Sequence, residues 1–119
     1  MKKSQRMKTV NSLAERNERE QADKFAKSQQ KCEIQQKKLA ELKQYYQEYM
    51  DSSRKMSGEF LDISRLQETR AFMTKLSGAI AQQRDIVRNL EVTMNTDRKH
   101  WMDSRRARPK RLNSVLLMT

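Results

Sequence analysis

Between residues 25 and 56 the apolar positions of the chain recur every seven residues. Two heptad positions alternate at spacings of three and four, which places them on one stripe of an α-helix. One position holds Phe25, Cys32, Leu39 and Tyr46, and its partner position holds Ser28, Gln35, Leu42, Tyr49 and Met56. Polar residues interrupt the stripe further upstream. The pattern therefore predicts a first helix over about residues 5–56 that is loosest at its N-terminal end.

A second and more regular heptad pattern follows. One position holds Leu66, Met73, Ile80, Val87, Met94 and Trp101, and its partner position holds Thr69, Leu76, Gln83, Leu90, Asp97 and Ser104. Four of the six residues in the partner set are polar, so the seam is expected to loosen toward the C-terminus. Pro109 lacks an amide donor and disfavours helix at the residue before it. We therefore expect a second helix over about residues 64–108 and an irregular tail over 109–119.

Serines and Gly58 form the only loop-like cluster between the two patterns, which predicts a turn at about residues 57–63. Two heptad helices joined by a short turn favour an all-α fold, a long antiparallel coiled-coil hairpin that forms a single domain over residues 1–119. The alternative is one continuous helix that pairs with a second copy, because only Gly58 argues against it.

A turn centred near residue 59 also sets the pairing of the two helices. Leu39 should then lie beside Leu76–Ile80, and Phe25 beside Leu90–Met94.

The composition agrees with a thin, one-seam structure. Of 119 residues, 35% are hydrophobic and 34% charged, with 2 glycines and 1 proline, which disfavours a thick core and favours long helices. The net charge of +11 points to an acidic partner: nucleic acid, an anionic membrane or an acidic protein surface. The chain has neither a signal-peptide pattern nor a membrane-span pattern, and its single cysteine fits a reducing compartment. We expect a cytoplasmic protein.

Residues that could carry catalysis are sparse and scattered. The chain has no Gly-rich phosphate loop, and His100 and Cys32, its only histidine and cysteine, lie in different helices. His100 is expected to face solvent, and Cys32 to fill the seam as a small apolar residue. The sequence therefore indicates no enzyme activity, no metal, no cofactor and no small-molecule substrate.

A second apolar stripe exceeds what one seam requires. Phe72, Ala79 and Ile86 each precede a core position by one residue, and Tyr45 likewise precedes core Tyr46. The stripe either widens the seam or contacts a partner. The pairing above places Tyr45 and Phe72 near each other outside the main seam.

Positive charge collects at the end of the hairpin that carries both termini. We expect this basic end to face a partner, and its residues are Lys2, Lys3, Arg6, Lys8, Arg105, Arg106 and Arg108. The alternative is an ordinary solvated charge cluster.

The order of these landmarks resembles a known family. The segment "YYQEYM…SGEFLDISRLQETRAFMTKLSGAIAQQR", followed later by "RKHW", is similar to the flagellar FliJ proteins. The resemblance covers about residues 38–101 and consists of the tyrosine cluster, the glycine turn, the "QR" pair and the later tryptophan.

This resemblance implies a stalk-like coiled coil of the flagellar type III export apparatus. Members bind the hexameric export ATPase through the end that carries both termini and promote its assembly. They also contact the cytoplasmic domain of the export gate and help to cycle export chaperones, so membrane association is implied only through partners. The gate-contacting face of the family corresponds here to Leu42, Tyr45, Tyr49, Phe72, Leu76 and Ala79.

Two departures from the family pattern are visible. Lys38 and Gln83 replace the usual Gln and His on the gate-contacting face, and Pro109 interrupts a second helix that relatives continue well past the tryptophan. A different function class, a basic coiled coil that binds nucleic acid, also fits the net charge. The aromatic residues argue against it, because they do not lie among the C-terminal arginines where bases could stack.

Overall fold

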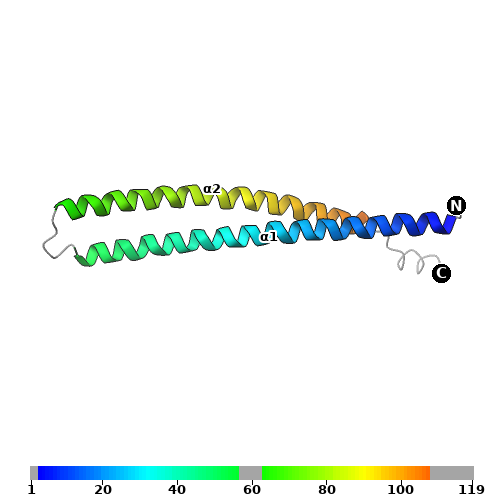
Figure 1. Ribbon diagram of the computed structural model, residues 1–119, viewed down its shortest axis with the longest axis horizontal. Helices are drawn as coiled ribbons and strands as arrows, with labels where there is room; N and C mark the ends of the chain where they lie inside the picture. The colour runs from blue at the N-terminus through cyan, green and yellow to red at the C-terminus, as the bar shows by residue number, and fades with distance from the viewer. Residues whose placement is uncertain (1–2, 57–62, 108–119) are drawn as a thin grey trace. The chain divides into compact units, whose positions relative to one another are not determined.

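The computed structural model describes residues 3–56 and 63–107, which form two long helices (Figure 1). Helix α1 spans Lys3–Met56 and helix α2 spans Ile63–Ala107. Interhelical contacts pair Gln35 with Gln83 and Tyr45 with Phe72, so the helices are antiparallel. The predicted all-α hairpin is confirmed, and the described residues contain no strand. Gly58 of the predicted turn and the predicted helix break at Pro109 lie outside these residues.

Local sequence favours both helices. The α1 segment contains neither glycine nor proline, and α2 contains only Gly78. Exposed pairs four residues apart, such as Arg16 with Glu20 at 3.6 Å and Asp23 with Lys27 at 3.0 Å, each add a few tenths of a kcal/mol. Such small terms do not hold long helices by themselves, so the seam between α1 and α2 supplies most of the stability.

The helices build two compact units. The inner unit comprises residues 31–91, and the terminal unit comprises residues 1–30 and 92–119. In the inner unit the seam buries Cys32, Leu76, Ile80 and Val87. These four residues occupy predicted heptad positions, so the seam assignment is confirmed for them, whereas Leu66, which was also predicted in the seam, is 37% exposed.

The inner seam also contains a buried polar contact. Gln83 is 7% exposed and its Nε2 donates to the backbone oxygen of Gln35 at 3.0 Å and to Oε1 of the same residue at 2.8 Å. A buried amide that finds its partner in only one alignment disfavours slipped pairings of the two helices.

In the terminal unit the seam stays closed, and the expectation that it loosens toward the C-terminus is wrong. Ser28, Asp97 and Ser104 are all buried. The hydroxyls of Ser28 and Ser104 donate to backbone oxygens three residues earlier, at 3.0 and 2.6 Å, and Asp97 lies 3.8 Å from the Lys24 ammonium. Short polar side chains that hydrogen-bond to the backbone of their own helix permit close packing of the two helices. Counting polar positions in the sequence does not reveal this packing.

Phe25 makes a contact that the sequence analysis did not predict. Its ring stacks on that of Trp101, with centroids 5.5 Å apart and an interplanar angle of 24°. Helical side chains lean toward the N-terminus of their own helix. In an antiparallel pair the side chains of Phe25 and Trp101 therefore lean toward each other. Their rings meet although the two residues are offset along the helices by more than one helical turn.

Candidate protein-interaction surfaces

Three aromatic rings from both helices form a cluster in the inner unit. The Tyr45 ring lies 6.0 Å from that of Phe72 at 82°, and the Tyr49 ring lies 4.8 Å from that of Phe72 at 46°. Tyr45 and Tyr49 are 6.4 Å apart. The predicted proximity of Tyr45 and Phe72 is confirmed. We call these three residues the aromatic cluster.

The cluster is only partly covered by the hairpin. Tyr45 is 48% exposed and Phe72 is 37% exposed, whereas Tyr49 is half-buried. Phe72 leaves the seam because it precedes core Met73 by one residue, a rotation of about 100° around the helix. Tyr45 stands in the same relation to Tyr46. The fold therefore leaves two large rings in contact with water beside a closed seam.

The other residues assigned to this face have different environments. Leu42 and Ala79 are half-buried and line one groove together with Tyr45. Leu76 is only 7% exposed and belongs to the core. Leu76 thus supports the surface from below, and the exposed area comes mainly from Tyr45 and Phe72.

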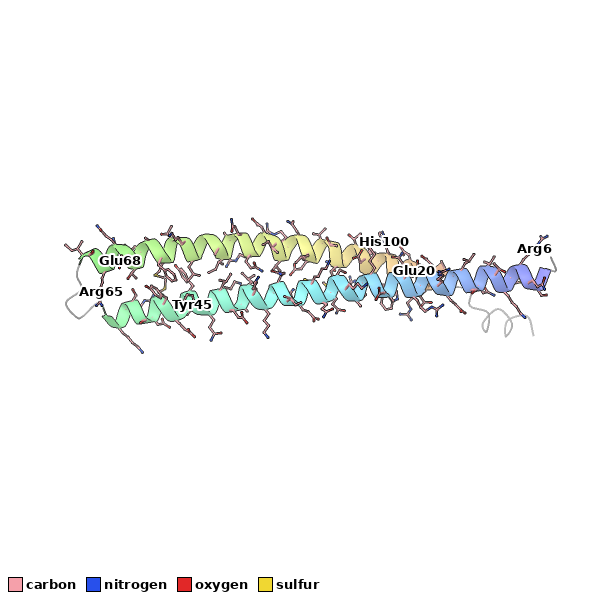
Figure 2. All side chains as sticks on the ribbon, in the orientation of Figure 1. Arg6, Glu20, Tyr45, Arg65, Glu68 and His100 are labelled. Carbon is pink, nitrogen blue, oxygen red and sulfur yellow. The ribbon has the colours of Figure 1, made fainter. Side chains whose placement is uncertain are left out.

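A second groove adjoins the other side of the cluster. Tyr49 and Phe72 line it together with polar residues near the start of α2, including Arg65 and Glu68 (Figure 2). The aromatic rings therefore lie between a more apolar groove near Ala79 and a more polar groove near Glu68. Such a gradient from apolar to polar is typical of the core and rim of protein interfaces.

The stripe of Phe72, Ala79 and Ile86 follows the edge of the seam. Ile86 is 44% exposed, and Ala79 is half-buried. Ile34 of α1 is 55% exposed and lines a groove with Ile86. Sequence reasoning missed Ile34, although an isoleucine two positions after core Cys32 lies outside the heptad stripe, and that offset is a usable signal.

The predicted basic end is described in part. Arg6 and Lys8 are exposed on α1, and Arg105 and Arg106 are exposed on α2. Figure 2 shows Arg6 near the start of α1. Lys2 and Arg108 lie outside the described residues, and Lys3 is described only as part of helix α1.

Arg105 has a role within the fold that the sequence did not indicate. Its guanidinium lies 5.1 Å from the centroid of the Trp101 ring, and its Nε lies 3.9 Å from Glu18 Oε1. An arginine four residues after a tryptophan lies on the same helix face, which is the signal that could have found this contact. Glu18 thus places a negative charge beside one of the basic residues of the terminal unit.

The remaining candidate residues agree with the sequence analysis. Cys32 is buried in the seam, and burial, followed by the nearby carboxylates of Glu91 and Glu33, raises the pKa of its thiol above the ordinary value of 9.0. His100 is exposed on α2 (Figure 2). The described parts of both helices contain no group of three or more potential metal ligands, and neither helix there is long and apolar enough to cross a membrane.

Comparison with known proteins identifies the family. The family model described as flagellar FliJ protein matches residues 2–111. No curated protein and no solved structure matches the chain. The matched region contains both helices, the aromatic cluster and the basic residues of the terminal unit. The chain belongs to the flagellar FliJ protein family, whose members are non-enzymatic components of flagellar type III protein export.

Proposed function

We propose that this chain is a stalk-like coiled coil that binds the hexameric export ATPase, promotes its assembly and activity, and couples it to the cytoplasmic domain of the export gate and to export chaperones. The observation that carries the proposal is the exposed aromatic cluster, in which Tyr45 and Phe72 come from different helices and remain in contact with water. The hairpin does not require either ring outside its seam.

The aromatic cluster is the proposed gate-binding surface. Large rings held by a rigid helical pair lose little conformational freedom on binding, and aromatic residues often supply most of the affinity of an interface. Leu42 and Ala79 extend the apolar area, and buried Leu76 holds α2 in place beneath it. The Gln83 amide is occupied by Gln35, so it supports the surface through packing rather than by direct contact.

The terminal unit is the proposed ATPase-binding region. Arg6 and Lys8 are exposed on α1, and the same stretch exposes Met7, Val10 and Leu13. Positive charge accelerates docking on an acidic surface, and exposed apolar side chains add contact area once the complex has formed. Arg106 contributes to this charge from α2, whereas Arg105 is already engaged by Trp101 and Glu18.

Purified components test both contacts directly. The full chain should co-purify with the cytoplasmic domain of the export gate and should separately increase the ATPase activity of the export enzyme. Deletion of residues 102–119 should reduce ATPase stimulation and leave gate binding unchanged, because the aromatic cluster lies in the inner unit. If the full chain neither binds the gate domain nor stimulates the ATPase, the proposal is wrong.

Duplex DNA provides the competing outcome. A chain of net charge +11 will attract DNA at low salt, and that attraction falls steeply as salt rises. Gate binding through the aromatic cluster should depend much less on salt. Tight, steeply salt-dependent DNA binding without any effect on the ATPase would favour a nucleic-acid-binding function instead.

A further inference from the structure

A second apolar surface extends along the inner unit away from Phe72 and Tyr49. One groove, of about 470 Å³, is lined by Ile34, Ile86 and Leu90 together with polar residues. Another, of about 510 Å³, is lined by Leu42, Tyr45 and Ala79. Ile86 lines both of them, so the two grooves adjoin each other. We call the surface formed by these two adjoining grooves the isoleucine groove.

The spacing of its apolar residues indicates the shape of an occupant. Ala79 and Ile86 are seven residues apart on α2, and Leu90 follows one turn later. From Ala79 to Leu90 the helix rises about 17 Å at about 1.5 Å per residue, or three turns. A surface with heptad spacing between two antiparallel helices accepts the apolar stripe of a third helix.

The charged residues at the rim of the groove indicate which charge the bound helix should carry. Lys31 and Lys38 line the isoleucine groove from α1, one heptad apart, on either side of Ile34. Both are exposed, and neither forms a salt bridge within residues 3–56 and 63–107. The one carboxylate in the two linings is that of Glu41, in the groove that Tyr45 lines. The end near Ile34 is therefore apolar with a basic rim.

We propose that the isoleucine groove binds an amphipathic α-helix of a partner protein, with apolar residues at heptad spacing and an acidic flank that meets Lys31 and Lys38. A second copy of this chain fits poorly, because its net charge of +11 would repel the basic rim. One end of this surface, lined by Leu42, Tyr45 and Ala79, overlaps the proposed gate-binding surface, so a bound helix and the gate would compete for it. The other end, lined by Ile34 and Leu90, lies outside the residues of that surface.

A labelled synthetic helix serves as the probe. Two peptides of about 20 residues, long enough to form isolated helices, carry leucine at both heptad positions and differ only in glutamate or lysine flanks. Fluorescence anisotropy with the full chain should show binding of the glutamate peptide and at least about tenfold weaker binding of the lysine peptide. Ile34→Asp should weaken binding of the glutamate peptide about tenfold or more, with helicity unchanged because Ile34 is exposed.

Charge reversal separates a specific groove from general attraction. Lys31→Glu with Lys38→Glu should weaken the glutamate peptide about three- to tenfold and strengthen the lysine peptide. The matched control, Lys37→Glu with Lys43→Glu, makes the same change in charge on exposed residues that do not line the isoleucine groove. Equal effects of the two double reversals, or no effect of Ile34→Asp, would overturn the proposal.

Two further measurements identify other occupants or a shared site. Self-association of the wild-type chain in sedimentation, lost in Ile34→Asp, would assign the groove to a second copy and contradict a partner helix. Phe72→Ala should leave peptide binding intact, whereas loss of binding would show that the peptide recognises the aromatic cluster instead. Failure of the gate pull-down leaves these peptide results unaffected, so the two proposals fail separately.

Discussion

The rings of Tyr45 and Phe72 meet edge to face, 6.0 Å apart at 82°, although they belong to different helices and both remain partly exposed. Such a pair contributes about 0.5–1.5 kcal/mol beyond the area it buries. That contribution is modest beside the burial of the seam residues Leu76, Ile80 and Val87. The pair therefore matters more as a contact surface for a partner protein than as a source of fold stability.

Replacing both rings separates these two roles. We expect Tyr45→Ala with Phe72→Ala to lower the free energy of unfolding by about 1–2 kcal/mol, to leave helicity nearly unchanged by circular dichroism, and to abolish gate binding. Val92→Ala is the control, because Val92 is 62% exposed and lies in the terminal unit. A large loss of helicity would show instead that the two rings are core residues.

Adjacent arginines in the terminal unit should respond differently to charge reversal. Arg105→Glu removes the contact with Trp101 and places a carboxylate near Glu18, so we expect a loss of about 1 kcal/mol in urea denaturation. Arg106→Glu should change stability by less than about 0.5 kcal/mol but still reduce ATPase stimulation. Equal stability of the two variants would mean that the contacts of Arg105 contribute nothing measurable.

The buried amide of Gln83 should be needed for stability. Gln83→Ala removes hydrogen bonds of 2.8 and 3.0 Å to Gln35 and leaves a half-buried side chain without its partner. We expect a loss of about 1–2 kcal/mol in the free energy of unfolding. The exposed neighbour Gln82 provides the matched control, and Gln82→Ala should cost less than about 0.5 kcal/mol. If both variants unfold at the same urea concentration, the polar contact in the seam is dispensable.

The buried thiol of Cys32 should make the stability of the folded state depend on pH. Burial raises the pKa of its thiol in the folded state above the ordinary value of 9.0, so the folded state holds this proton more tightly than the unfolded chain does. The resulting stability is present below pH 9.0 and is lost as the pH rises through the folded pKa. Comparison of thermal unfolding for the wild type and Cys32→Ala isolates this effect from the titration of lysines and tyrosines.

The expected result is a stability advantage of the wild type at neutral pH that narrows above pH 9.0. A constant difference across this range would show that the thiol titrates alike in the folded and unfolded states. Slow reaction of Cys32 with a maleimide before unfolding, and fast reaction in urea, would confirm independently that the thiol is buried.

Much of the fold could be predicted from the sequence, because helical periodicity is a local property. Heptad spacing identified Cys32, Ile80 and Val87 as seam residues, and all three are buried. An offset of one residue from the seam also sufficed to place Tyr45 and Phe72 together outside it. These inferences needed only 3.6 residues per turn and an approximate position for the turn.

Other features depend on how two helices meet, which heptad counting does not describe. Polarity at Asp97 and Ser104 suggested a loose seam, yet both are buried because short side chains find hydrogen-bond or charge partners at close range. The lean of Phe25 and Trp101 toward each other decided their stacking.

The sequence by itself thus determined the helical segments and the residues that leave the seam, and it favoured antiparallel pairing over one continuous helix. Only the tertiary structure decided that Arg105 is held by Trp101 and Glu18, and that Ile34 and Ile86 line one groove with a basic rim. The physical reason is that a periodic pattern records the direction in which a residue faces on its own helix. Distances between side chains of different helices depend on register, side-chain length and the approach of the two backbones.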